Sequence, residues 1–227
     1  MAIESGSNSG SPHHVVVLGH PAPGSFNHAI AERYCSTVRA CGQHATLRDL
    51  YELEFDPRLY ADHRPGRQTN TTSGDVAGEM GLLLAADAIV LVYPIWFGMP
   101  PAMIKGYVDR VLGHALTPRD IAKHVPDDVL RGRHFATFST SATSLPWLKQ
   151  QGQLASLKVT FDHYLLQIFG MIDAGHTHFA GIVDGLVKAE AEEILAAVET
   201  KARDTCTAIE ARRAAIRSRP LMGADLE

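Results

Sequence analysis

Two short stretches of the chain are apolar at every position. They are Val15 to Leu18 and Ala88 to Tyr93. Strands with one solvated face alternate between apolar and polar residues, whereas continuous apolar runs are typical of parallel strands covered by helices on both faces. Both stretches therefore predict central strands. Further strands are predicted at His44 to Leu50, Arg133 to Thr140 and Met171 to Phe179.

Apolar residues recur at helical spacing between these strands. One set, four residues apart, is Phe26, Ile30, Tyr34 and Val38, and another lies within Ile104 to Leu112. A long helix is predicted from about Gly185, with glutamates early and basic residues late, as the helix dipole favours. A nucleic-acid arm would explain its basic end, but a solvated helix face explains it better.

The alternation of strands and helices predicts an α/β fold with right-handed crossovers and a mostly parallel five-stranded sheet. The expected strand order is 2-1-3-4-5, with helices on both faces. Residues 13–227 are predicted to form a single domain after a disordered leader, residues 1–12. Segments rich in turn-forming residues, Phe55 to Ser73 and Thr117 to Gly132, are predicted to be surface excursions.

Composition narrows the possible partners. The 227 residues are 45% hydrophobic and carry a net charge of −4, which indicates no general attraction to nucleic acid or anionic membranes. Membrane insertion is not expected, because no apolar run reaches the roughly 18 residues of a spanning helix. The three cysteines form no CxxC pair, which favours free thiols and a reducing, cytoplasmic location.

The loop predicted after the first strand has residues suited to binding an anion. Gly24 permits close backbone approach, and Ser25 and Asn27 stand where N-caps and phosphate ligands occur. A phosphate at a helix N-terminus needs no lysine or arginine, and His20 at the strand end could reach it. A capped helix with an incidental histidine explains this loop equally well. The chain has neither GxGxxG nor a Walker sequence.

The loop after the third strand, Tyr93 to Pro101, is the most specific pattern in the chain. Trp96 and Phe97 are adjacent aromatics flanked by prolines, at an edge where they should be exposed. Large apolar side chains on such a loop usually need something flat to cover them, as a flavin ring would. The alternatives are a hydrophobic plug or a dimer contact. A third loop, Phe138 to Trp147, offers small and hydroxyl residues near the same edge.

Other reactive side chains have explanations simpler than catalysis or metal binding. His176 and His178, two apart on a strand, share a face as metal ligands could, but no third ligand is evident. Strand-end histidines lining an acceptor pocket, or satisfied surface groups, are the preferred interpretation, and no metal is expected. Cys35 lacks a recognisable histidine partner and is not expected to be a nucleophile.

Three segments resemble the flavodoxin-like NAD(P)H:quinone oxidoreductases, the DT-diaphorase type and its bacterial relatives. They are GHPAPGSFNHAI, DLYELEFDPRL and YPIWFGMPPAMIKGYVDRV, and the resemblance spans roughly residues 13 to 182. It implies a flavodoxin-like fold with a flavin phosphate held by His20, Ser25, Phe26 and Asn27. It also implies a flavin ring lying against Pro94, Ile95, Trp96 and Phe97, with its other edge closed by Ser139, Thr140, Ser141 and Ala142.

The chain departs from the family in the third loop. Many relatives have Thr-Thr-Gly-Gly where this chain has Ser139 to Ala142. Trp147 stands at the position of a tyrosine that assists hydride transfer in the DT-diaphorase type, and no histidine matches its partner. No catalytic residue is therefore carried over.

The resemblance implies an enzyme that passes hydride from NADH or NADPH through FAD or FMN to a quinone-like acceptor by a ping-pong mechanism. The long C-terminal region slightly favours FAD. The alternatives are an NAD(P)H-dependent flavin or azo reductase, a flavodoxin-type electron carrier, and a flavoprotein that regulates a transporter. Relatives build the site at a two-fold interface, so a cytoplasmic homodimer is expected.

Overall fold

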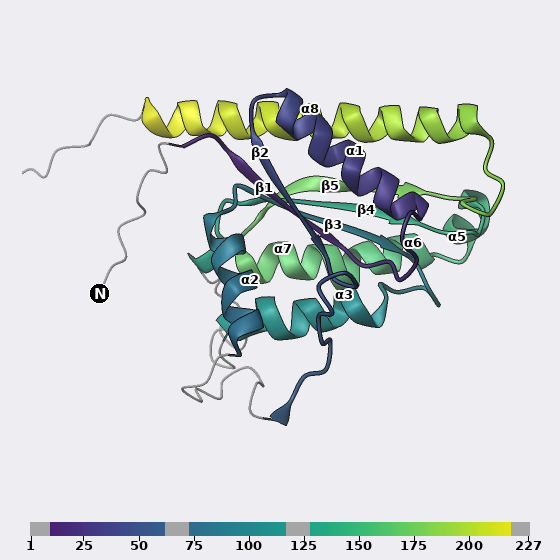
Figure 1. Ribbon diagram of the computed structural model, residues 1–227, viewed down its shortest axis with the longest axis horizontal. Helices are drawn as coiled ribbons and strands as arrows, with labels where there is room; N and C mark the ends of the chain where they lie inside the picture. The colour runs from purple at the N-terminus through teal and green to yellow at the C-terminus, as the bar shows by residue number, and fades with distance from the viewer. Residues whose placement is uncertain (1–9, 62–72, 117–127, 219–227) are drawn as a thin grey trace, which may run out of the picture.

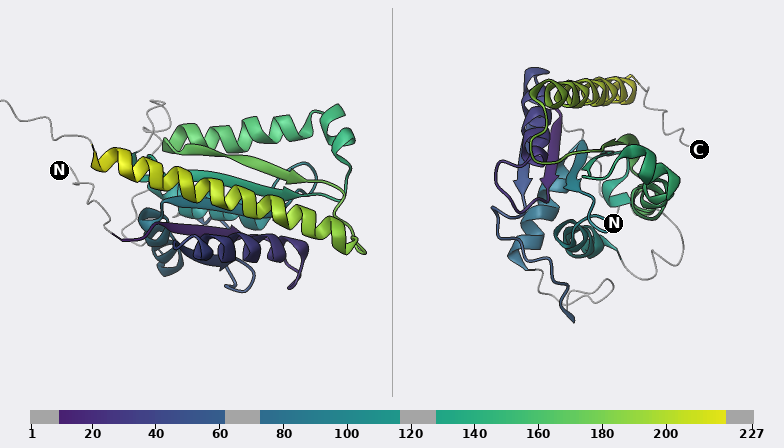
Figure 2. Two further views of the ribbon diagram at one scale, coloured as in Figure 1. Left: turned by 90° about the horizontal axis from the view of Figure 1, so that it is seen from above. Right: turned by 90° about the vertical axis from the view of Figure 1, so that its right-hand side faces the viewer.

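A computed structural model describes residues 10–61, 73–116 and 128–218. The chain forms a three-layer sandwich, with one twisted sheet between two layers of helices (Figure 1). Seen from above and from the end, the long C-terminal helix lies beside α1 on one face of the sheet, and the remaining long helices cover the other (Figure 2).

The sheet has five parallel strands in the order β2-β1-β3-β4-β5. Their bounds are β1 His13–Leu18, β2 His44–Asp49, β3 Ala88–Pro94, β4 His134–Thr140 and β5 Ile172–Phe179. Every residue of β3 and β4 is buried, because these strands have helices on both faces. The pairing of β4 with β5 contains a register shift between Phe135 and Ala136.

Helices fill every connection between the strands. The longer ones are α1 Phe26–Ala40, α2 Gly74–Ala85 and α8 Lys188–Arg217. Helix α3 Ala102–Tyr107 continues into the π-helical turn η2 Val108–Leu112 and the short η3 Gly113–Ala115. After η4 Asp128–Leu130, the β4–β5 connection contains α5 Leu145–Gln150, α6 Gln153–Leu157, the π-helical η5 Lys158–His163 and α7 Tyr164–Phe169.

Alternating strand residues build a separate apolar core on each face of the sheet. On one face, Val16 and Val90 pack under α1 and α8, through residues such as Tyr34 and Val198. On the other face, β1, β3 and β4 pack against α2, α3, η2, η5 and α7. The strands are therefore anchored on both sides, and their ends are held in fixed relative positions.

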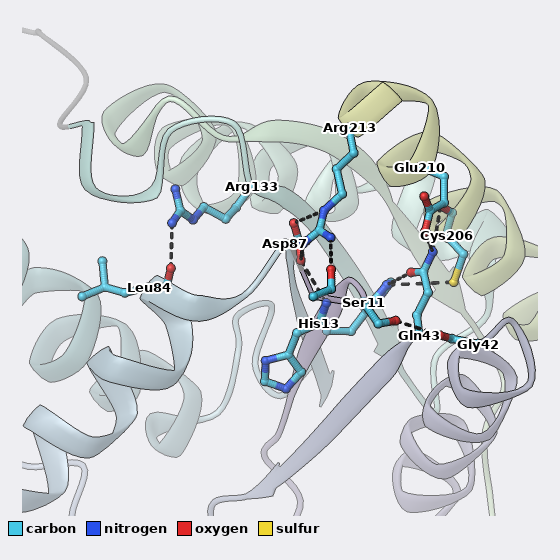
Figure 3. Close-up of polar contacts among 12 residues, drawn as sticks. Ser11, His13, Gly42, Gln43, Leu84, Asp87, Arg133, Cys206, Glu210 and Arg213 are labelled. Carbon is cyan, nitrogen blue, oxygen red and sulfur yellow. Dashed lines mark hydrogen bonds and ion pairs between the residues drawn. The ribbon is translucent and has the colours of Figure 1, made fainter. Parts of the chain in front are cut away.

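The C-terminal half of α8 is fixed to the amino-terminal edge of the sheet by polar contacts (Figure 3). The Arg213 guanidinium donates to both carboxylate oxygens of Asp87, at 3.1 and 2.7 Å, and Asp87 also accepts from the backbone N–H of His13 at 2.9 Å. The Gln43 amide donates to the Cys206 carbonyl at 3.2 Å. Helix α8 thus runs along the sheet away from the carboxyl ends of the strands (Figure 1).

The fold expected from the sequence is confirmed in strand order, strand direction and helix placement. All three cysteines are free thiols. Within the residues described, no helix is long and apolar enough to cross a membrane. Residues 1–9 of the expected leader, and residues 62–72 and 117–127 of the two expected surface excursions, lie outside the described residues. The single-domain assignment stays a prediction.

The side chain of His14, on β1, is fully buried. His14 Nε2 donates to Gln43 Oε1 at 2.9 Å, which leaves Nδ1 to accept from the Tyr34 hydroxyl at 3.0 Å. This pairing requires a neutral ring. Burial disfavours the imidazolium and lowers the pKa of His14 to about 4.

Stability should therefore fall as the pH falls from 7 to 5. The unfolded chain takes up a proton at His14 near pH 6.5 and the folded chain only near pH 4, so the unfolded state binds more protons between these values. The loss expected from His14 alone is about 2 kcal/mol of unfolding free energy. Denaturant titrations at each pH measure the total. His14→Gln should make the profile less steep by this amount, and an equally steep profile in that variant would assign the loss to other groups.

Gly106 lets α3 pack directly on the segment after β2. A Cβ at this position would overlap the carbonyl oxygen and Cα of Pro57, which are backbone atoms that cannot move aside independently. Close packing on Pro57 therefore explains the glycine of the Lys-Gly pair in the segment YPIWFGMPPAMIKGYVDRV.

Gly106→Ala should destabilise the fold by about 2 kcal/mol through overpacking, although alanine has the higher helix propensity. The matched control is Gly81→Ala in α2, where a Cβ meets nothing within 4 Å. This variant should gain about 0.5–1 kcal/mol. Thermal and denaturant unfolding compare the two variants, and equal shifts would contradict the packing role of Gly106.

Candidate functional site

The loops after β1, β3 and β4 meet at the carboxyl-terminal edge of the sheet, where parallel α/β folds bind ligands. Backbone hydrogen bonds hold each loop to its neighbour. These bonds run from Gly19 N to Val92 O at 3.0 Å, from Ile95 N to Thr140 O at 2.7 Å and from Ser141 N to Phe179 O at 3.0 Å. The three predicted binding segments are therefore side by side.

The N-terminus of α1 is open to an anion. Ser25 is the N-cap residue, with extended backbone angles, but its side chain makes no capping hydrogen bond. The first turn of the helix contains no acidic residue. Backbone N–H groups of a first helical turn lack partners within the helix and carry about half a positive charge in total. This end of α1 thus has donors and a favourable dipole for a phosphate.

The Ser25 hydroxyl belongs to a short series of hydrogen-bonded side chains that the sequence did not reveal. Its Oγ lies 2.8 Å from His28 Nδ1, and His28 Nε2 donates to Asp49 Oδ2 at 2.8 Å. Asp49 ends β2, and its other carboxylate oxygen accepts from the backbone N–H of Tyr51 at 3.0 Å. Asp49 therefore orients His28, and His28 orients the Ser25 hydroxyl at the helix N-terminus.

His20 stands between the first and second loops. Its Nδ1 accepts from the Ala22 backbone N–H at 3.1 Å, and burial lowers the pKa of its imidazole. The neutral ring therefore carries its proton on Nε2, which remains a donor. Its centroid lies 6.2 Å from that of His28 and 6.0 Å from that of Trp96. His20 thus connects the two loops that were predicted to hold phosphate and ring.

Two of the predicted phosphate residues have side chains with structural roles. Asn27 is buried, and its amide nitrogen donates to Thr140 Oγ1 at 3.0 Å, which joins the first loop to the end of β4. Phe26 is partly buried against the core under α1. Only the backbone N–H groups of these residues are left for a ligand.

Trp96 and Phe97 lie on a tight turn after β3. Trp96 and Met99 exchange two backbone hydrogen bonds, of 3.0 and 3.1 Å. The corner residues Phe97 and Gly98 have φ of +51° and +81°, which places both in the left-handed region of a type I′ turn. Phenylalanine is disfavoured in that region, so the turn holds this side chain outward at a conformational cost.

The turn exposes an unusual amount of apolar surface. Phe97 is fully exposed and Trp96 is 42% exposed. Met99 of the second loop and Trp147 on α5 are each more than two-fifths exposed as well. Pro94 is buried at the end of β3 and Ile95 is partly buried, so these residues support the turn from beneath. An apolar surface around one edge of a sheet is typical of a binding site.

The four residues predicted to close the edge of the ring differ in exposure. Ser139 and Thr140 end β4, and these two residues and Ser141 have less than a tenth of their surface exposed, whereas Ala142 is open to solvent. Ser139 and Ser141 are hydrogen-bonded to His176 and His178, so both histidines have satisfied partners. Among the residues that the structure describes, no group of three metal-ligating side chains is arranged to hold a metal ion.

Sequence reasoning missed His28 and Asp49. The available signal was spacing, since Ser25 and His28 are three apart on one helix face. Asp49 pairs with Leu18 in the register of β2 and β1, which places it beside the phosphate loop.

Comparison with known proteins supports the same assignment of fold. Residues 12–204 match the family model described as flavodoxin-like fold. An uncharacterized NAD(P)H oxidoreductase of Haemophilus influenzae is 38% identical over 102 residues, covering 44% of this chain and 50% of the relative. The rat NAD(P)H dehydrogenase [quinone] 1 is 28% identical over 116 residues, covering 43% of this chain and 42% of the relative.

A solved structure extends the likeness over most of the chain. The NAD(P)H:quinone oxidoreductase of Methanothermobacter marburgensis superposes with a TM-score of 0.71 at 21% identity, covering 86% of this chain and 96% of that one. The chain spans about half the length of the curated relatives it matches. The expected family is confirmed by a match over most of the sequence, and the chain belongs to the flavodoxin-like fold family.

Proposed function

We propose that the chain is a flavin-dependent oxidoreductase that transfers hydride from NADH or NADPH to a quinone-like acceptor. One observation carries the proposal: an uncapped helix N-terminus and an exposed aromatic turn lie at the same edge of the sheet. The names of the relatives, as NAD(P)H oxidoreductases and quinone dehydrogenases, support the same activity.

The residues present fit a flavin in both of its parts. The phosphate requires donors without negative charge nearby, and the first turn of α1 has neither an acidic residue nor a side-chain cap. The ring requires a flat apolar surface, which Trp96 and Phe97 would supply from the turn after β3. Dinucleotide binding by a glycine-rich Rossmann loop has no support, since the chain lacks that sequence.

A bound flavin would supply the hydride chemistry, accepting two electrons from the nicotinamide and passing them to the acceptor. The chain's own residues position the reactants. His20 Nε2 and the backbone N–H groups of the first turn of α1 would donate to the phosphate. The Ser25 hydroxyl donates its one hydrogen to His28 Nδ1, and this contact, oriented by Asp49, would hold the N-cap in place. Ile95, Trp96 and Phe97 would cover one face of the ring, which leaves one face for nicotinamide and acceptor in turn, as a ping-pong mechanism requires.

The choice of FAD, assembly into a homodimer and a cytoplasmic location stay predictions. The C-terminal region that favoured FAD forms α8, and the buried face of α8 packs on α1 and the sheet. The phosphate site at α1 suits FMN and FAD equally. Assembly into a homodimer would cover the exposed Phe97 and Trp147, and a cytoplasmic location agrees with the free thiols.

Purification and spectroscopy test the proposal directly. The protein as isolated should contain a yellow flavin, which mass spectrometry of the released cofactor identifies as FMN or FAD. Anaerobic NADH or NADPH should bleach it, and benzoquinones should restore the colour faster than azo dyes do. A protein that binds neither flavin, or a bound flavin that neither nicotinamide bleaches, would overturn the proposal.

Removing the oriented hydroxyl should weaken flavin binding. Ser25→Ala and His28→Gln should each raise the Kd for FMN about tenfold, because either change removes the contact that holds the N-cap and misplaces backbone N–H donors. A hydrogen bond to a charged group contributes about 1.5 kcal/mol or more. Quenching of FMN fluorescence measures the Kd. The control is Ser36→Ala on the same helix, where Ser36 Oγ donates to the Arg33 carbonyl. If all three variants bind FMN equally, the Ser25 hydroxyl has no part in holding the phosphate.

Phe97→Gly should change stability and binding in opposite directions. Glycine adopts φ of +51° without a steric penalty, so the flavin-free protein should gain about 1 kcal/mol of unfolding free energy. Loss of the ring should weaken FMN retention at least tenfold. Leu59→Ala, another exposed apolar residue, is the control and should change neither quantity appreciably. Unaltered FMN affinity in Phe97→Gly would remove this side chain from the ring site.

A further inference from the structure

Five side chains form a continuous hydrogen-bonded series beneath the β4–β5 edge of the sheet. We call it the polar chain, and in order it consists of Asp162, His176, Ser139, His178 and Ser141. Successive contacts are 2.5 Å from His176 Nδ1 to Asp162 Oδ2, 2.6 Å from His176 Nε2 to Ser139 Oγ, 2.8 Å from Ser139 Oγ to His178 Nδ1 and 3.1 Å from His178 Nε2 to Ser141 Oγ. Ser141 Oγ then donates to the Thr143 carbonyl at 3.0 Å.

The number of protons that the polar chain requires can be counted. Its contacts, including the last one to Thr143, number five, and each needs one hydrogen. An ionised Asp162 and two neutral imidazoles offer only four hydrogens, one on each ring and one on each serine. The fully bonded arrangement therefore contains a fifth proton, and without it one contact must open.

In the fully bonded arrangement the fifth proton lies in the contact between Asp162 and His176, whose Oδ2 and Nδ1 are 2.5 Å apart. Burial, together with the charges of His176 and Lys158, lowers the pKa of His178 to about 4, so His178 stays neutral near pH 7. In the fully bonded arrangement His178 has its proton on Nε2 and donates to Ser141, while Ser139 donates to His178 Nδ1. His176 Nε2 then donates to Ser139, and its Nδ1 shares a proton with the Asp162 carboxylate.

Loss of one proton at the Ser141 end rearranges the whole polar chain. Each donor passes its hydrogen to the next acceptor: His178 to Ser141, Ser139 to His178, and His176 to Ser139. His176 is left neutral beside an ionised Asp162, and His178 now carries its proton on Nδ1. Four hydrogens remain, and one proton has moved in effect from the Asp162 end to the Ser141 end without any side chain changing place.

The two ends of the polar chain face different surroundings. Asp162 and His176 line a cavity of about 270 Å³ at the sheet edge, together with Lys158, His163 and Asp173. Ser141 follows Thr140 at the end of β4, and the Thr140 carbonyl accepts from Ile95 N of the second loop at 2.7 Å, whereas the backbone of Ser141 is bonded to Phe179 and Ile182. The polar chain thus connects an open polar cavity with the edge of the sheet where the ring site is proposed.

Other charged and titratable groups lie around the polar chain. Lys158 donates to the His176 carbonyl at 3.3 Å, and Thr137 on β4 donates to Asp162 at 3.3 Å. Tyr93 pairs with Ser139 in the sheet, and burial, then the charge of Asp162, raises the pKa of its phenol well above the usual value. Tyr93 therefore stays protonated, and no neighbour on β3 competes for the transferred proton.

We propose that the polar chain is a proton relay that supplies the candidate flavin site from the β5-edge cavity; the inference rests on the proposed function. Reduction of a quinone by NAD(P)H yields NAD(P)⁺ and a hydroquinone, and consumes one proton from solution besides the hydride. The relay takes that proton at Asp162 and His176 and releases it at Ser141, and solvent in the cavity reloads it. Each residue of the polar chain passes a proton to the next one, and Ser139 connects the two histidines.

Histidine NMR of the flavin-free protein tests the relay without any turnover. With ¹⁵N-labelled rings, assigned by His176→Gln and His178→Gln, the His178 proton should lie on Nε2 when His176 is charged. It should move to Nδ1 at the same pH at which His176 loses its proton, while His178 itself remains neutral. In Ser139→Ala the position of the His178 proton should no longer change when His176 loses its proton. Rings that titrate independently in the native protein, or an unaltered response in Ser139→Ala, would overturn the proposal.

Turnover of the flavin-loaded enzyme supplies the second measurement. Ser139→Ala should lower kcat about 10²-fold, within the range for proton-transfer groups, and leave the flavin Kd within twofold. Ser139→Thr keeps the hydroxyl and should restore most of the rate. The control is Thr177→Val, which lies between the two histidines on β5 but points to the opposite face. Native turnover in Ser139→Ala would overturn the relay.

The relay and the proposed function fail in different ways. If the protein binds no flavin, the proposed function is wrong, and the linked titration of the two histidines is still measured in the same sample. If flavin binds and is bleached by NAD(P)H but the two rings titrate separately, the relay alone is wrong.

Discussion

The parallel pairing of β1, β3 and β4 is the constraint on which the candidate site depends. Because these strands run in one direction and are buried on both faces, their carboxyl ends lie side by side and are fixed relative to one another. Backbone bonds from Gly19 to Val92 and from Ile95 to Thr140 fix the loops at that edge. A cofactor bound there would meet an arrangement already formed in the protein, so little binding energy would be lost in ordering it.

The same edge combines features that would be costly in a protein without a ligand. Ser25 leaves the start of α1 uncapped, Phe97 has a disfavoured backbone conformation with its ring in solvent, and Trp147 is exposed nearby. Each feature has a small cost in stability, and all three lie in the segments that directly follow β1, β3 and β4. Departures from local rules that gather in this way are expected at functional sites.

Much of the fold could be predicted because the patterns that indicate its strands and helices each lie within one short stretch of sequence. The apolar run Ala88 to Tyr93 indicated a buried strand, and the spacing of Ile30 and Tyr34 indicated α1. The polar chain could not be predicted. The pairing of His178 with Ser139 depends on a register shift near Phe135, and the contact of His176 with Asp162 depends on a π-helical segment. Neither leaves a periodic pattern in the sequence, so the two histidines were correctly placed on one face but not connected to their partners.

The central claim is that one edge of the sheet binds a flavin by its ring and its phosphate together. Equilibrium titration of the flavin-free protein with FMN and with riboflavin, which lacks the phosphate, tests it most directly. The account predicts one FMN per chain and binding about 10²-fold tighter than that of riboflavin, as two charge-assisted hydrogen bonds would provide. Equal affinity for the two compounds, or no binding of either, would contradict it.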